Sequence, residues 1–308
     1  MLFEVPVLMI AFNRPDTTRE VFKVVKKVKP KKLFVAIDGP RSGNRYDKEK
    51  CMQVKEIFEG IDWDCEVKTL YREGNMGCHK AVPDSISWFF KYVDFGIILE
   101  DDCLPDISFF RFCEELLSTY KNNEKVMMVT GDNFLSVKKF TNDSYFFSKY
   151  AFIWGWATWK RAWLKYDDHM SSYTNFSHSG NMTSSFSNII ERFFWRTAFN
   201  NKYYGYREGW DTKWIYALIS NGGISVIPNN NLITNIGMRA DATTTKGFDK
   251  NMYVESSSIS FPLNHPNSLY RNTKFDKLVF KKVFLSEVTI KSVLNNYIHI
   301  ISCKKDGI

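Results

Sequence analysis

The stretch FGIILEDDCLP, at residues 95–105, is the part of the sequence around which the rest of the chain is organised. Its apolar residues 97–99 run directly into three consecutive carboxylates, Glu100, Asp101 and Asp102. A short apolar run of this kind predicts a strand buried on both faces. Adjacent carboxylates at a strand end repel one another and lose solvation, so they are costly without a compensating cation. A solvated acidic turn is the alternative, but ligands bind at the carboxyl ends of strands in open α/β sheets, which favours a site.

The residues before this stretch predict alternating strands and helices. Short apolar runs are typical of buried strands, and apolar residues at helical spacing are typical of amphipathic helices. Strands are expected at residues 5–12, 32–38 and 65–71. Helices are expected at residues 47–58 and 81–92, and a further helix that follows the first strand is expected to end near residue 28. Strand–helix–strand repeats are typical of a parallel sheet with right-handed crossovers. We therefore predict an α/β fold in which helices flank a mostly parallel central sheet.

The later residues predict more elements of the same kinds. Asp106 is a suitable N-cap for a helix that continues to Tyr120. Strands are expected at residues 126–130 and 224–228, and helices at residues 189–199 and 214–219. Residues 171–187 are rich in Ser, Thr and Asn, which indicates a mobile loop or a variable insertion. The expected divisions are two halves of one domain, residues 1–135 and the aromatic-rich residues 136–270, and a basic amphipathic tail at residues 271–308.

The composition is ordinary for a soluble globular protein, with 44% hydrophobic and 25% charged residues. The six cysteines form no CxxC pair, so we expect reduced thiols without a zinc or disulfide framework. Glu4 and Pro6 interrupt the apolar start, which argues against a signal peptide. No run approaches the ~20 apolar residues of a membrane span. A cytoplasmic location follows as the expectation.

The net charge of +8 is partly concentrated in residues 23–32 and 274–305. Basic clusters attract phosphates, nucleic acid or anionic membranes. We expect the first cluster to be a solvated helix face, and we expect no nucleic-acid partner. The tail mixes basic and apolar residues, which suits a helix at the inner membrane surface and a solvated packing helix equally well.

Several motifs together resemble the GT-A (Rossmann-like) fold of bacterial polysaccharide glycosyltransferases. They are VLMIAFNRP at residues 7–15, IDGP at 37–40, REGNMG at 72–77, LEDDCLP at 99–105 and WDTKW at 210–214. They occur in the order seen in that family and in the N-acetylglucosaminyltransferase that initiates complex N-glycans. The resemblance implies an inverting, metal-dependent enzyme that moves a sugar from a UDP-sugar to a hydroxyl of a glycan acceptor. The acceptor could be lipid-linked, as in the biosynthesis of capsule or O-antigen.

The resemblance also implies roles for individual residues. Asp102 would ligate Mn²⁺ or Mg²⁺, and the metal would act as a Lewis acid on the departing diphosphate. His265 would complete the metal shell, although a structural hydrogen-bonding role stays open for it. The contacts with the nucleotide sugar would come from Phe12, Asn13, Arg14, Asp38, Arg72, Asn75, Lys80, Glu100 and Asp101.

The WDTKW motif supplies a candidate general base. An inverting transfer needs a carboxylate that takes the proton of the acceptor hydroxyl. Asp211 is the carboxylate left in this motif, and Trp210 and Trp214 would desolvate it and strengthen it as a base. The alternative, compatible with the first, is that Asp211 caps the following helix. Trp156 and Trp210 are expected to bind the acceptor, while most of the aromatic segment around Trp156 is expected to be core.

Other functions stay open. A nucleotidyltransferase that makes sugar nucleotides shares the broad fold, but it would be expected to carry a Gly-rich basic loop after the first strand. The chain has Phe12-Asn13-Arg14-Pro15 there, with no glycine. A non-catalytic carbohydrate- or nucleic-acid-binding protein fits the basic charge and the aromatic content, but binding alone does not require EDD at a strand end. A retaining transfer is a further alternative, because it needs no base at Asp211.

Overall fold

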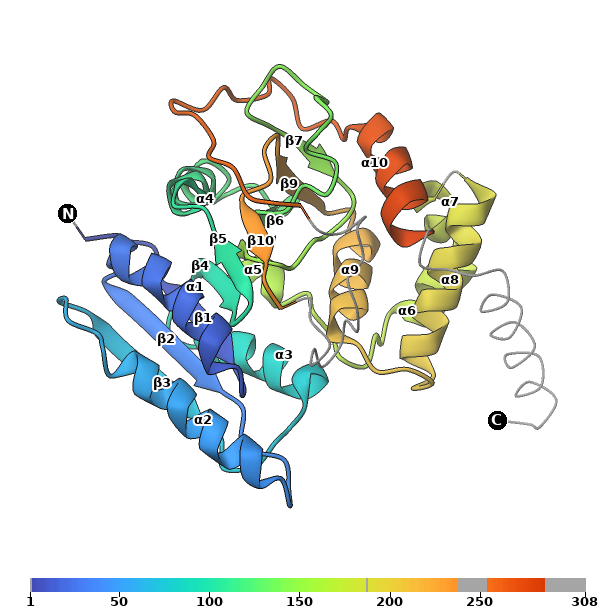
Figure 1. Cartoon of the computed structure of the whole chain (residues 1–308). Coiled ribbons are helices and arrows are strands. Elements are labelled where there is room, and N and C mark those ends of the chain that lie inside the picture. The colour runs from blue at the N-terminus through green and yellow to red at the C-terminus, as the bar shows by residue number, and fades with distance from the viewer. Residues whose placement is uncertain (1, 187, 238–253, 286–308) are drawn as a thin grey trace.

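The computed structural model describes residues 2–186, 188–237 and 254–285, and its centre is an eight-stranded sheet (Figure 1). The strand order is β3-β2-β1-β4-β8-β6-β9-β7. In that order, the strands are Glu66–Tyr71, Lys32–Ile37, Val7–Ala11, Phe95–Glu100, Trp156–Trp159, Val126–Thr130, Ile224–Pro228 and Tyr145–Ser148. Strands β3, β2, β1 and β4 are parallel, as are β6 and β9, whereas β8 and β7 are antiparallel to their neighbours. The predicted α/β fold is confirmed.

Helices cover both faces of this sheet. One core takes side chains from α1, α2 and α4, and the other takes them from α3, α8, α9 and α10. Successive residues of β1 alternate between the cores: Val7 and Met9 lie in the first, and Leu8 and Ile10 lie in the second. The helices are α1 (Pro15–Val28), α2 (Arg45–Phe58), α3 (Cys78–Phe89), α4 (Ser108–Thr119), α5 (Lys160–Trp163), α8 (Ile189–Tyr203), α9 (Trp210–Ser220) and α10 (Thr273–Val279).

The strand directions define two edges of the sheet. Strands β1 and β4 pair with Ile10 opposite Glu100, so both end at the same edge. Strand β6 ends there too, because β6 and β4 are each antiparallel to β8. A two-stranded sheet of β5 (Cys103–Pro105) and β10 (Ile233–Asn235) continues from this edge. We call it the carboxyl edge, and the opposite edge, where β6 and β9 begin, the amino edge.

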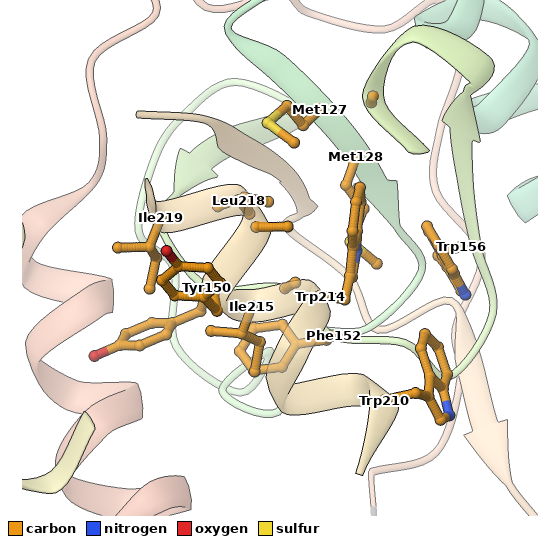
Figure 2. Close-up of a cluster of buried hydrophobic side chains, with 14 of the residues drawn as sticks. Met127, Met128, Tyr150, Phe152, Trp156, Trp210, Trp214, Ile215, Leu218 and Ile219 are labelled. Atoms are coloured by element: carbon orange, nitrogen blue, oxygen red, sulfur yellow. The ribbon is translucent and has the colours of Figure 1, made fainter. Parts of the chain in front are cut away.

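Tryptophans of the second half form part of the core. Figure 2 shows Trp156, Trp210 and Trp214 beside Met128, between α9 and the sheet. The ring of Trp156 lies 5.7 Å from that of Trp214 and 6.4 Å from that of Trp210, measured between centroids. All three side chains are buried. The prediction that Trp156 and Trp210 bind an acceptor is corrected, because rings removed from solvent in this way present no face to a sugar.

Residues 171–187 were expected to form a mobile loop or a variable insertion, and the first of these alternatives is wrong for the described part. They contain α6 (Tyr173–His178) and α7 (Asn181–Ser185). Tyr173, Phe176 and Met182 anchor the two short helices in the core. The few apolar residues are spaced so widely among Ser, Thr and Asn that the composition concealed them.

The start of the tail packs against the same core. After α10, a π-helical turn covers Phe280–Phe284. Phe275, Val279, Phe280 and Val283 are buried, so this part is a packing helix. The predicted membrane contact of the later tail lies outside the described residues. Within the described ranges, no helix combines the length and the apolar character that a membrane span requires.

Candidate functional site

The acid stretch and the turn after β1 meet at the carboxyl edge. Arg14 contacts both aspartates: Nη2 lies 3.0 Å from Asp101 Oδ1, and Nη1 lies 2.8 Å from Asp102 Oδ2. The backbone N–H of Phe12 donates a hydrogen bond of 3.1 Å to Asp101 Oδ2. Because β1 and β4 are parallel neighbours, the residues that follow them emerge side by side. These four residues and Glu100 form what we call the acid site.

The acid site carries more negative than positive charge. Burial, together with the charges of Asp102 and Asp101, raises the pKa of Glu100 to about 8. Burial also raises the pKa of Asp101, although the guanidinium of Arg14 opposes this shift. Asp101 is 3% exposed, so solvent does little to screen its charge. Three carboxyl groups share one guanidinium, and a further cation would therefore be stabilised here.

Asp38 organises the loop that precedes α3. Its buried carboxylate accepts hydrogen bonds from Asn75 Nδ2 at 2.9 Å and from the backbone N–H groups of Met76 and Gly77 at 3.0 and 3.1 Å. Such donors satisfy a buried carboxylate without any ligand. Asp38 and Asn75 therefore have structural partners in the loop, and their predicted nucleotide-sugar contacts stay predictions.

Asp47, in the first turn of α2, joins the turn after β1 to this helix. Its Oδ1 accepts hydrogen bonds from Asn13 Nδ2 at 2.7 Å and from Arg41 Nη2 at 2.9 Å. The hydrogen bonds from Arg41 hold the pKa of Asp47 at about 2. The guanidinium of Arg41 also lies over the ring of Phe12, 5.6 Å from its centroid. Sequence reasoning missed Arg41 and Asp47, because neither belongs to a motif and only the folded chain brings them to Asn13.

Arg72 and Lys80 occupy different environments around α3. The side chain of Arg72 is 8% exposed and donates from Nη2 to Asp84 Oδ2 at 2.6 Å and to Ser85 Oγ at 3.1 Å. Arg72 therefore anchors α3, and its predicted contact with a nucleotide sugar stays a prediction. Lys80 is exposed in the first turn of the same helix, and its predicted contact stays a prediction.

Asp211 borders the acid site from the first turn of α9, where its charge contributes to the raised pKa of Glu100. Asp211 is exposed, whereas Trp210 and Trp214 are buried, so these rings do not desolvate it as predicted. The helix begins at Trp210 after Gly209, and no side chain caps it. The alternative that Asp211 caps the helix is therefore wrong as well.

His265 lies apart from the acid site, against α4 and β7. Its Nδ1 hydrogen-bonds with the hydroxyl of Tyr145 at 2.8 Å, and its Nε2 lies 3.1 Å from Glu115 Oε1. Both ring nitrogens are thus engaged by neighbours that do not belong to the acid stretch. The predicted metal role of His265 is corrected to the structural role that the sequence left open.

Gly237 closes the acid site from the side of β10, and sequence reasoning did not single it out. The backbone N–H of Ile236 donates to the carbonyl of Asp102 at 2.8 Å, which places the next residue over the carboxylates. A Cβ atom on Gly237 would overlap Asp102 Oδ2 and Arg14 Nη1. Only glycine leaves room here for the pair, and its position just after β10 becomes informative once β10 is seen to pair with β5.

The donor atoms of the acid site suit a hard divalent cation. Mg²⁺ prefers oxygen ligands and usually takes one or two carboxylates, with phosphate oxygens and water completing its shell. Asp101 and Asp102 supply such carboxylates. Within the described residues, no three His, Cys, Asp or Glu side chains form a metal cage. Asp101 and Asp102 are therefore the residues of the acid site that could hold such an ion.

Comparisons with known proteins found distant structural likenesses. No protein-family model and no curated protein matches the chain. A solved structure of 4-diphosphocytidyl-2C-methyl-D-erythritol synthase from Anaerococcus prevotii DSM 20548 is 13% identical over 41% of this chain and 54% of its own, with a TM-score of 0.29. A cytidylyltransferase from Leptospira borgpetersenii serovar Hardjo-bovis (strain JB197) is 12% identical over 53% of this chain and 63% of its own, with a TM-score of 0.32.

These structures correct the predicted activity. Both are cytidylyltransferases, so they agree with the nucleotidyltransferase alternative rather than with an inverting glycosyltransferase that uses a UDP-sugar. The glycosyltransferase prediction and its polysaccharide context are therefore corrected, while the general-base role of Asp211 is untested and stays a prediction. The chain spans 54% and 63% of these structures, and likenesses this distant transfer no substrate or residue role. The function has to be argued from the acid site itself.

Proposed function

We propose that the chain is a metal-dependent nucleotidyltransferase. It would join the nucleoside monophosphate part of a nucleoside triphosphate to a phosphate-bearing second substrate, such as a sugar 1-phosphate. The observation that carries this proposal is the contact of Arg14 with Asp101 and Asp102 at the carboxyl edge. One phosphate-binding cation and two metal-binding carboxylates thereby lie within a single site.

The charges of the substrates explain why both kinds of group are needed. A nucleoside triphosphate and a sugar 1-phosphate are each anionic, and the carboxylates of the acid site would repel them. A divalent cation on Asp101 and Asp102 would reverse that repulsion. It would also release the guanidinium of Arg14, whose planar fork suits phosphate oxygens as well as carboxylates.

On this proposal, the chain's own residues bind and orient the reacting groups together with a metal ion. An oxygen of the second substrate's phosphate forms a bond to the α-phosphorus, the bond from that phosphorus to its bridging oxygen breaks, and pyrophosphate leaves. Arg14 would stabilise charge on the transferred phosphoryl oxygens, while a bound metal ion would neutralise the leaving group. The attacking phosphate is already ionised at neutral pH, so the reaction needs no general base, which is consistent with the exposed position of Asp211.

The turn after β1 lacks the glycines of a phosphate loop, and the acid site accounts for this difference. The backbone N–H of Phe12 is bonded to Asp101, so it is not free to bind a phosphate. Recognition of phosphate would therefore fall to the side chain of Arg14. On this proposal, the side chain of Arg14 binds the phosphate in place of the backbone N–H groups of a glycine-rich turn.

The test is release of pyrophosphate. The chain is incubated with Mg²⁺ or Mn²⁺, each of the four nucleoside triphosphates and a panel of sugar 1-phosphates, and pyrophosphate is measured with and without the second substrate. Asp102→Asn and Arg14→Gln are expected to abolish release that depends on the second substrate. Asp64→Asn, a change at an exposed aspartate away from the site, is the matched control and should keep it.

A second assay with nucleotide sugars decides between the proposal and other transfers. If the chain releases a nucleoside diphosphate from a nucleotide sugar and no pyrophosphate from any triphosphate, the proposal is wrong. Wild-type transfer by Asp102→Asn would also contradict it, because the reaction would then not need the carboxylate to which the metal is assigned.

A further inference from the structure

A cavity of about 310 Å³ opens at the amino edge of the sheet. Lys125 precedes β6, Gly222 and Gly223 precede β9, and Lys149 follows β7, which runs antiparallel to β9. Because the acid site lies where β1 and β4 end, the two sites occupy opposite edges of one sheet. The cavity is therefore separate from the site described above.

The wall of the cavity contains a buried, fixed cation. The side chain of Lys149 is 8% exposed, and its Nζ lies 2.7 Å from Glu191 Oε1 and 3.2 Å from the carbonyl of Ser185. Glu191 is itself held by the hydroxyl of Tyr150. A buried lysine costs several kcal/mol of desolvation unless it is paired, so this ion pair fixes the ammonium group at the cavity wall.

Two exposed cations add to the charge of the wall. Arg271 and Lys125 line the cavity together with Lys149, and none of its described lining residues is acidic. Ser184 and Ser185 line it as well; the hydroxyl of Ser184 donates to the carbonyl of Asn181 at 3.0 Å, and that of Ser185 could donate to an anion. The buried carboxylate of Asp276 accepts a hydrogen bond of 2.6 Å from Ser148, and the charges of Lys149 and Arg271 oppose the rise that burial causes in its pKa. The lining therefore presents positive charge and polar donors.

The end of α9 does not explain this collection of cations. A helix C-terminus attracts positive charge through its unpaired carbonyls. Here the carbonyls of Ala217, Leu218 and Ile219 accept hydrogen bonds from the backbone N–H groups of residues 221, 223 and 222. The last turn is thus capped by its own chain, so it does not account for the cations that line the cavity.

From these contacts we infer that the amino-edge cavity binds a small phosphate-bearing molecule. Its volume lies at the lower end of the range of ligand pockets, which suits inorganic phosphate or a phosphorylated sugar and excludes a large cofactor. Arg271 and Lys125 bind the oxyanion from the open side, and Lys149 completes its neutralisation from the wall. This inference does not rest on the nucleotidyltransferase proposal, since it concerns the other edge of the sheet.

The test measures binding of anions without any nucleotide. Inorganic phosphate and glucose 6-phosphate are titrated calorimetrically into the chain at constant ionic strength, in chloride buffer. Arg271→Gln and Lys125→Gln are each expected to weaken binding about tenfold, the loss expected when one charge-assisted hydrogen bond is removed. The exposed Lys48→Gln is the matched control and should bind as the wild type does.

A second arm identifies the source of the phosphate group. Phosphatidylcholine vesicles with and without phosphatidic acid are tested in a sedimentation assay with the same variants. Binding that depends on Arg271 in the calorimetric arm assigns the cavity to a soluble ligand, and binding that depends on it only with phosphatidic acid assigns it to a lipid headgroup. The inference is overturned if no probe binds at millimolar concentration, or if Arg271→Gln and Lys125→Gln bind every probe as tightly as Lys48→Gln.

Discussion

The two edges of the central sheet carry opposite charges built on the same plan. At the carboxyl edge, the buried Asp101 is paired with Arg14, and Asp102 adds further negative charge. At the amino edge, the buried Lys149 is paired with Glu191, and Lys125 and Arg271 add further positive charge. Each buried charge has an oppositely charged partner, which lowers the cost of burying it, while neighbours of like charge leave an excess of one sign around the pair. An excess of one charge around a buried ion pair, rather than the pair itself, therefore indicates the kind of ligand.

Asp102→Asn should have the largest effect on activity. The change keeps the shape of the side chain but removes a charge that the metal requires, so substrate-dependent pyrophosphate release should fall by roughly 10²–10³-fold. Phosphate binding at the amino edge should not change. Kinetic assays and calorimetry on the same preparation measure both, and a loss of phosphate binding in this variant would mean that the two edges are not independent.

Gly237→Ala should have the next largest effect, and it tests how closely β10 covers the acid site. The added Cβ would overlap Asp102 Oδ2 and Arg14 Nη1, so it should separate this pair and weaken Mg²⁺-dependent nucleotide binding at least about tenfold. Fluorescence titration with a labelled nucleotide measures the change. Gly180→Ala is the matched control, because a Cβ at Gly180 meets no atom within 4 Å. Equal binding by both variants would show that β10 moves away when substrate binds.

Asp47→Asn should change stability more than binding. Arg41 lowers the pKa of Asp47 from 3.8 to about 2, so the folded state favours the ionised carboxylate. The stabilisation is fully present above about pH 4 and is lost as the pH falls through 2. We expect the variant to lose about 1 kcal/mol of unfolding free energy at pH 7 and less at pH 2.5, since two charge-assisted hydrogen bonds weaken. Urea unfolding at both pH values measures this, and an equal loss at both would contradict the role of the charge.

The smallest expected effect is that of His265→Gln. Because His265 contacts Tyr145 and Glu115 rather than the acid stretch, metal-dependent nucleotide binding should stay within about twofold of the wild type, with about 1 kcal/mol lost from stability. Titration with Mn²⁺ and thermal unfolding separate these two quantities. A large loss of metal affinity with unchanged stability would return His265 to the acid site.

The elements of the first half were predictable, and so was the place of one site. The apolar run before Glu100 predicted β4, and the runs around Val7 and Leu33 predicted its parallel neighbours, because continuous apolar strands are stable only when both faces are covered. The carboxylates at the end of β4 then marked the carboxyl edge. Boundaries differed by a few residues, for example Arg45–Phe58 for a helix expected at residues 47–58.

The roles of single side chains could not be predicted in the same way. Asp38, Arg72 and His265 are polar residues near strand ends or in loops, and the sequence could not tell whether a ligand or the protein itself would satisfy them. The structure shows that neighbouring groups of the chain satisfy each one. Trp156 is another case, because burial depends on what the fold places over a ring.

The amino-acid sequence alone was enough to predict the alternation of strands and helices, the buried strand before the EDD motif and the negative charge at its end. These follow from periodicity and adjacency, which are local properties of the chain. The tertiary structure was needed to show that Arg14 contacts Asp101 and Asp102 and that Gly237 covers them. It was also needed to show that Lys125, Lys149 and Arg271 line one cavity. Those contacts join residues far apart in the chain. They depend on the strand order and on the direction of each strand, which local sequence patterns do not specify.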